Sequence, residues 1–214
     1  RFTDNSVLFS GYEWSLDYIK KFAQEGREFS LAYKIDGNVQ DQNSVITQDD
    51  LTLLNDPSLF RDERNLNDGN NKEVTYQADY VHPFSDKFKL EMGGKAIVRN
   101  VDSDFGFSSL DPRTGEYQDI AARTDIFYYD QDVYAGYVST QVTLPAKIGM
   151  IAGVRYESTA IGGSFQNIED PFENTYENWL PSLTMSKTFG RGKTVKFGYS
   201  KRIQRPGLRQ INPF

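Results

Sequence analysis

The chain has 214 residues, with 30 acidic and 24 basic side chains and a formal net charge of −6. This balance argues against a general polyanion binder, and no nucleic-acid partner is predicted, because phosphate contacts need clustered Lys and Arg. Cysteine is absent, which excludes disulfides, thiolate metal sites and thiol nucleophiles.

Large apolar and polar residues alternate with a period of two, which predicts strands that are apolar on one face. The 13 Tyr and 15 Phe of this hydrophilic chain favour an all-β protein of that kind. No apolar run approaches 18 residues, so no transmembrane helix is predicted. In chain order, eight strands in four hairpins are expected at 8–18 with 29–35, 74–80 with 88–98, 132–144 with 148–158, and 178–189 with 194–203.

The connections between these strands fall into two classes. Short turns are expected at Ala23–Gly26, Ser85–Lys87, Pro145–Lys147 and Gly190–Lys193. Long polar loops are expected at 38–72, 100–127 and 162–176. Short turns at one rim and long loops at the other predict an antiparallel up-and-down transmembrane β-barrel of the outer-membrane type. A soluble sandwich or lipid-binding barrel is the alternative, and its apolar face would point inward.

Aromatic residues stand where a membrane barrel needs interfacial anchors. Those beside the short turns are Phe22, Phe29, Phe84, Phe88, Phe189 and Phe197. Those near the long-loop ends, expected to form a second girdle, are Tyr128, Tyr129, Tyr176 and Trp179.

The charged residues between the apolar positions predict the inner wall of the barrel. A charge in lipid costs kilocalories, so these side chains must face the lumen. The lumen-facing candidates are Glu91, Lys95, Arg99, Arg155, Glu157 and Arg202. The even positions of 8–18 and 88–98 are expected to face lipid. The wall is then either solvated and internally paired, or in contact with a plug or a solute.

Signals for catalysis are poor, and neither an enzyme nor a bound cofactor or metal is predicted. His82 is the single histidine and lies beside Pro83 at a strand end, where an interfacial or capping role is expected. The stretch GRGKT lacks the glycine that a phosphate-binding loop needs at position 187, which is Lys187. Asp102–Gly106 lacks the spacing of an EF-hand loop, so solvated outer loops are expected there.

Four stretches resemble the outer-membrane β-barrel family of TonB-dependent receptors. They are ADYVHPFSDKFKLEMGGKA, DVYAGYVS with AGVRYE, NWLPSLTMSKTF and YSKRIQRPGLRQINPF. The resemblance implies a Gram-negative outer-membrane barrel of about 22 strands with an N-terminal plug, which imports a scarce solute. Residues 1–214 would then be a single segment of that barrel, with no counterpart of the plug or the remaining strands. Its implied partners are outer-membrane lipid, the plug, the remaining strands and, in some members, surface lipoproteins.

The turn count leads to the same expectation without the family. An intact eight-stranded barrel with both ends in the periplasm has three short turns and four long loops, whereas this sequence predicts the reverse. Both ends are therefore expected on the long-loop side, with Phe214 inside a longer chain. A small structural or adhesive barrel and a soluble lipid-binding barrel remain alternatives. Siderophore, glycan, peptide and cobalamin all remain open as the solute.

Overall fold

The computed structural model describes residues 2–47, 62–111, 113–167 and 171–204. Nine antiparallel strands account for most of these residues. Their bounds are β1 Phe2–Lys21, β2 Glu28–Thr47, β3 Glu63–Ser85, β4 Phe88–Asp111, β5 Glu116–Asp119, β6 Asp125–Leu144, β7 Ile148–Phe165, β8 Phe172–Phe189 and β9 Lys193–Ser200. Single 3₁₀ turns lie at η3 Ala121–Arg123, η4 Pro145–Lys147 and η5 Gly190–Gly192.

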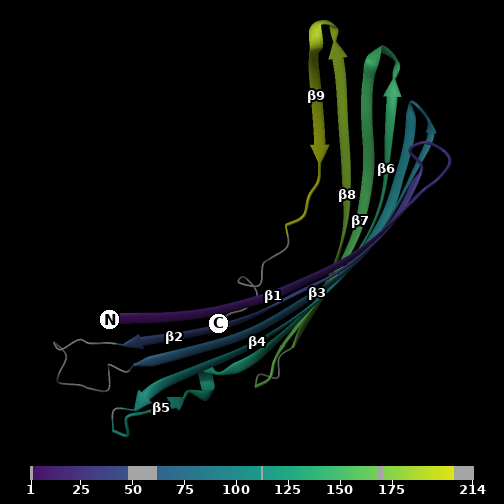
Figure 1. Cartoon of the computed structure of the whole chain (residues 1–214). Coiled ribbons are helices and arrows are strands. Elements are labelled where there is room, and N and C mark those ends of the chain that lie inside the picture. Colours follow the sequence, from purple (N-terminus) through teal and green to yellow (C-terminus); the bar gives the residue numbers. More distant parts are fainter. Residues whose placement is uncertain (1, 48–61, 112, 168–170, 205–214) are drawn as a thin grey trace.

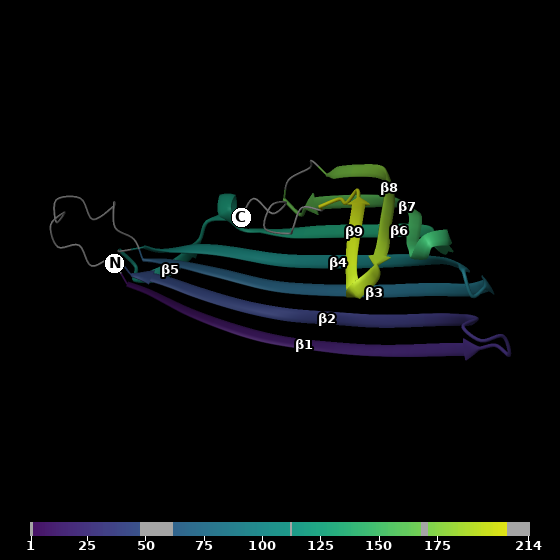
Figure 2. The same ribbon diagram turned by 90° about the horizontal axis from the view of Figure 1, so that it is seen from above.

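The strands form one sheet in the order β1-β2-β3-β4-β6-β7-β8-β9, and the short β5 folds back on β4. Each long strand therefore pairs with its neighbour along the chain, which is the expected up-and-down meander. Figures 1 and 2 show the sheet as a twisted, curved trough. Among the described residues β1 and β9 do not pair, so the sheet stays open at two edges.

The short turns contain the backbone conformations that tight reversals need. Gly26 and Gly192 adopt φ values of 75° and 74°, which glycine tolerates without a Cβ clash. In η4 the non-glycine residues Ala146 and Lys147 have φ values of 61° and 58°, directly after Pro145. Within the described ranges, no helix is long and apolar enough to cross a membrane.

The cross-strand register divides the sheet into an apolar and a polar face, because directly paired residues share a face. One row of partners runs Leu16–Tyr33–Tyr76–Ala96–Tyr134. The neighbouring row, one residue away on each strand, runs Asp17–Ala32–Gln77–Lys95–Ala135–Glu157. The alternation in the sequence is therefore in step across all the long strands.

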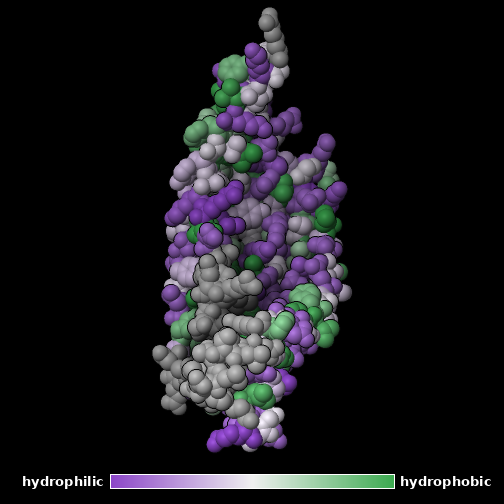
Figure 3. All heavy atoms as spheres, turned by 90° about the vertical axis from the view of Figure 1, so that its left-hand side faces the viewer, coloured by the Kyte–Doolittle hydropathy of each residue, from purple (hydrophilic) through white to green (hydrophobic). Residues whose placement is uncertain are grey.

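Burial identifies the polar face as the concave side of the trough. On that face Val133, Glu157 and Thr159 are 5%, 2% and 0% exposed, whereas Tyr76 and Tyr134 on the apolar face are both 53% exposed. Side chains crowd together on the inside of a curved sheet and spread apart on its outside. Figure 3 shows hydrophilic side chains gathered over the hollowed middle of the side that faces left in Figure 1.

The strands extend well beyond the predicted ones. The predicted long loops 38–72 and 100–127 are strand over much of their length, since β2 runs to Thr47, β3 begins at Glu63 and β4 runs to Asp111. The third predicted loop, 162–176, is also partly strand, since β7 runs to Phe165 and β8 begins at Phe172. The last strand is shorter than predicted, because β9 ends at Ser200. The centre of the first loop, 48–61, and the stretch 205–214 lie outside the described residues.

Candidate functional site

The apolar band on the convex face has a definite height. On β4 it runs from Phe88 to Val98, and the next convex positions are Asn100 and Asp102. Ten residues of strand span about 33 Å, and a tilt of about 40° reduces this to about 25 Å along the barrel axis. That is the height of the apolar band of an outer-membrane barrel. The sheet therefore has a turn-proximal half beside this band and a loop-proximal half beyond it.

In the turn-proximal half the concave face carries paired charges. Lys34 Nζ lies 2.9 Å from Glu13 Oε2 and 3.0 Å from Asp36 Oδ1, so it bridges β1 and β2. Along β7, Arg155 Nη2 lies 3.4 Å from Glu157 Oε2. In these pairs each charged side chain that lines the trough lies next to a charge of opposite sign.

A tighter polar contact ties two strands together that are not neighbours in the sheet. Tyr137 on β6 donates its hydroxyl hydrogen to Asp79 Oδ1 on β3 at 2.7 Å, reaching over β4. Gln77 Nε2 donates to the second carboxylate oxygen of Asp79 at 2.6 Å. The intervening residue in that row is Gly93, which has no side chain to block the contact.

Five of the six lumen-facing candidates lie on the concave, polar face by register. These are Glu91, Lys95, Arg99, Arg155 and Glu157. The sixth, Arg202, lies beyond the end of β9 and lines a cavity together with Tyr137 and Arg155.

The interfacial aromatics predicted beside the short turns cluster on the convex face. Phe84 and Phe88 stack with ring centroids 5.2 Å apart, and His82 contacts Phe84 at 4.4 Å. Phe22 packs edge-on against Tyr80, and Tyr80 is the cross-strand partner of Phe29. The Arg27 guanidinium lies over the Phe22 ring. His82, for which an interfacial or capping role is predicted, has its Nδ1 3.0 Å from the Tyr80 hydroxyl oxygen.

On β8 two predicted aromatics bracket the apolar band. Phe189 lies at the turn end and Trp179 ten residues away, followed at the next convex position by Glu177. Trp179 is 62% exposed and packs against Tyr156 at 5.0 Å.

The prediction of a second aromatic girdle is wrong for two of its four residues. Tyr129 is only 2% exposed and Tyr176 pairs with Thr159, so both belong to the concave face. Tyr128 lies on the convex face, as the girdle requires, because successive residues of a strand point to opposite faces.

A set of residues that sequence analysis left in a loop forms a cavity in the loop-proximal half of the concave face. Its volume is about 490 Å³. Asn70, which lies on the convex face by register, borders it. Six amide side chains of the concave face line it, from β2 and β3: Asn38, Gln40, Gln42, Asn65, Asn67 and Asn71. These amides recur at every second residue of two paired strands. This alternation is visible in the sequence, but the prediction of a loop over 38–72 left it without meaning.

The remaining wall of this cavity comes from β4 and β6. Ser103 donates its hydroxyl hydrogen to Asn67 Oδ1 at 2.9 Å, and Phe105 and Phe127 add apolar surface. Val101 and Phe127, which both line the cavity, form a small buried cluster with Tyr129 and the partly buried Ile161, Phe165 and Phe172. Burial raises the pKa of the Tyr129 phenol, so this cluster adds no charge to the cavity. Within the part of the chain that the structure describes, no group of three or more His, Asp or Glu side chains could hold a metal ion.

Comparison with known proteins gives a family and a fold. The profile of the outer membrane protein beta-barrel family matches residues 20–214. A search of curated protein sequences found none significantly similar to this chain.

Among solved structures, the unliganded ferric citrate transporter FecA is similar at 11% identity and a TM-score of 0.59, covering 86% of this chain and 26% of that one. The copper transporter OprC is similar at 16% identity and a TM-score of 0.62, covering 94% of this chain and 31% of that one. The ferric preacinetobactin receptor BauA from Acinetobacter baumannii is similar at 9% identity and a TM-score of 0.53, covering 86% and 29%. The chain thus spans less than a third of each of these structures.

Proposed function

The chain belongs to the outer membrane protein β-barrel family, and we propose that it forms a contiguous part of the wall of a larger receptor barrel that imports a scarce solute. Its place is the Gram-negative outer membrane, as predicted from the sequence. The observation that carries the proposal is the register, which collects apolar side chains on the convex face and polar ones on the concave face. A wall of this kind faces lipid outside and water inside.

The same register opposes the soluble alternative. A soluble lipid-binding barrel keeps its apolar side chains inside, where the lipid lies. Here the concave face carries ion pairs such as Lys34 with Glu13, while exposed rings such as Tyr134 and Trp179 cover the convex face. This distribution favours a membrane wall with a wet interior.

Residues 1–214 would act as one barrel segment, whose edges β1 and β9 pair with the remaining strands of the receptor. Unpaired backbone groups in lipid cost several kilocalories each, so a sheet with two open edges needs such partners. The plug would occupy the trough and meet its charged concave face, and surface lipoproteins would meet the loop-proximal rim. In this role the protein is a transporter and not an enzyme.

Cysteine labelling of the whole receptor in its native membrane tests the wall. The segment has no cysteine of its own, so labels within it are unambiguous. With Ala135→Cys on the concave face we expect reaction with a hydrophilic, membrane-impermeant maleimide. With Tyr134→Cys, one residue earlier on the convex face, we expect reaction only with a lipid-soluble maleimide. The reverse pattern would refute the assignment of faces.

Ion conduction separates a receptor from a small structural barrel. When urea displaces the plug of the purified receptor in a planar bilayer, a barrel of about 22 strands should conduct ions through its wide lumen. An eight-stranded barrel has its interior filled by side chains and should stay silent under the same conditions. Silence of the purified protein would favour the structural barrel.

A further inference from the structure

The amide-lined cavity, made by Asn38, Gln40, Gln42, Asn65, Asn67 and Asn71, has the position of a solute site. It lies on the concave face, beyond the apolar band and therefore on the loop side of the wall. Its volume of about 490 Å³ falls within the range of small-molecule sites, about 300–1,000 Å³. A solute entering the barrel from the loop side would meet this surface.

The lining is rich in hydrogen-bonding groups that are not already used. Each amide offers two donor hydrogens and a carbonyl acceptor. Asn67 and Asn71 each accept one side-chain hydrogen bond, from Ser103 and from Arg99 Nε. Among the described side chains, Asn38, Gln40, Gln42 and Asn65 have no hydrogen-bond partner. Groups that donate and accept side by side suit a ligand that also does both.

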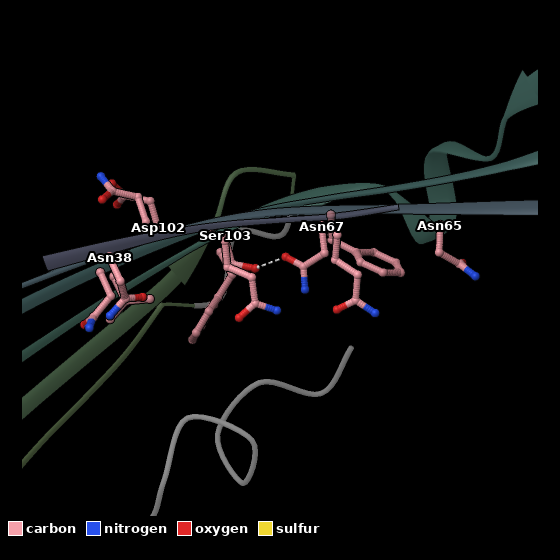
Figure 4. Close-up of a pocket in the computed structure, with 13 residues that line it drawn as sticks. Asn38, Asn65, Asn67, Asp102 and Ser103 are labelled. Carbon is pink, nitrogen blue, oxygen red and sulfur yellow. Dashed lines mark hydrogen bonds between the residues drawn. The ribbon is translucent and has the colours of Figure 1, made fainter. Parts of the chain in front are cut away.

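Charge is directed away from the cavity. Asp102 projects from the opposite side of the sheet, whereas Asn38 and Asn67 project into the cavity (Figure 4). Asp41 and Asp68, which pair directly with each other, lie on that same opposite face by register. A cation of the concave face, Arg99, lies at the margin of the cavity, where its Nε donates a hydrogen bond to Asn71 Oδ1 at 2.8 Å.

This chemistry does not suit the solutes named for the similar structures. Copper prefers sulfur and imidazole ligands, and none of the described residues that line the cavity is Met, Cys or His. A ferric chelate with negative charge calls for Arg or Lys, and neither is among the lining residues. Copper ions and negatively charged ferric chelates are therefore poor candidates for a ligand of this cavity.

We propose that the amide-lined cavity binds a neutral, hydroxyl-rich solute, namely an uncharged oligosaccharide. Each sugar hydroxyl can both donate and accept hydrogen bonds, and so can each of the six amides. The faces of sugar rings carry C–H groups, which pack on apolar surface such as the half-buried ring of Phe105. This inference rests on the proposed role as a receptor wall, and it adds the class of solute.

The test is binding to the purified whole receptor in detergent. Probes are maltohexaose, xylohexaose, cellohexaose and mannohexaose, with ferric citrate and Cu²⁺ as the contrasting class. We expect one neutral hexasaccharide to bind, and the double variant Gln40→Ala/Gln42→Ala to weaken its binding about 5- to 150-fold, since each of the two hydrogen bonds lost costs about 0.5–1.5 kcal/mol. The matched control is Asn43→Ala, on β2 but on the opposite face, which should change the affinity less than 2-fold.

Three results would overturn the proposal. They are the failure of all four hexasaccharides to bind, equal losses in the double variant and in the control, and binding of ferric citrate or Cu²⁺ that the double variant weakens. The proposed function is judged separately, by maleimide labelling and ion conduction. A receptor that passes those tests but binds no hexasaccharide would keep its role as a wall and lose this class of solute.

Discussion

Two adjacent glycines of β4 differ in the space around them. A Cβ on Gly93 would come within 2.7 Å of the Ala78 carbonyl oxygen and 2.6 Å of the Tyr137 ring, and would also meet the Asp79 carboxylate. A Cβ on Gly94 would meet the Ala135 carbonyl oxygen at an ordinary 3.5 Å. Gly93 is therefore the gap through which Tyr137 reaches Asp79.

We expect Gly93→Ala to destabilise the protein by about 1–3 kcal/mol, because backbone and side chains must both move to admit the methyl group. Gly94→Ala, its neighbour on the opposite face, should cost less than about 1 kcal/mol. Urea unfolding of the receptor in lipid vesicles measures both. Equal costs at the two positions would show that the Asp79–Tyr137 contact does not cross above Gly93.

Adjacent residues of β6 offer a test of depth in the membrane. Val138 lies in the convex row with Met92 and Val154, near the middle of the apolar band. We expect Val138→Arg to cost about 2–4 kcal/mol, as a cation in mid-membrane does, and Ser139→Arg on the concave face to cost about 1 kcal/mol or less. Unfolding in vesicles would again be measured, and a larger loss for Ser139→Arg would place lipid on the other face.

At the scale of the element, the long strands explain where sequence patterns fail. The β2–β3 ladder continues through Ile46 and Glu63, beyond the apolar band. Ladder hydrogen bonds join backbone groups, so they persist where side chains are polar on both faces. The period-two signal needs one face in lipid or in a core, and it vanishes where both faces meet water. The predicted loops 38–72 and 100–127 were therefore partly strand.

A disulfide can verify the register of this extension. Asn43 and Leu66 are direct partners on the convex face, so Asn43→Cys with Leu66→Cys should cross-link under mild oxidation. Asn43→Cys with Asn65→Cys should not, because Asn65 points to the opposite face. Non-reducing mass spectrometry of the digested receptor reads the outcome. A cross-link only in the second pair would mean that the register is shifted by one residue.

At the scale of the whole molecule, the two open edges govern assembly. Within the described ranges, antiparallel partners cover both sides of every long strand from β2 to β8 along at least part of its length, while β1 and β9 each have one neighbour. Such edges in lipid leave rows of backbone donors and acceptors without partners. The segment thus depends on further strands, or on closure with itself.

We expect residues 1–214 produced alone not to form a closed barrel in detergent or vesicles. The whole protein should show the heat-dependent shift in gel mobility and the protease resistance of folded barrels, and the isolated segment should show neither. A heat-dependent shift of the segment, with a disulfide between cysteines placed in β1 and β9, would demonstrate a complete small barrel.

The sequence alone determined a good deal about this protein. Its alternation revealed strands with one apolar face, its short turns revealed the hairpins, and its motifs revealed the family. It also contained the correction to the second girdle, because Tyr128 and Tyr129 are adjacent in one strand and cannot both face lipid. These features are local, since each depends on residues close together in the chain.

Tertiary structure decided which face is concave, how far the strands run and what the concave face brings together. The Asp79–Tyr137 contact joins residues 58 positions apart, and the amide-lined cavity combines residues from β2, β3, β4 and β6. No local pattern encodes such sites, because their members meet only when register and curvature are set for the whole sheet. Curvature also buries one face of a strand and exposes the other, a difference that the alternation by itself cannot assign.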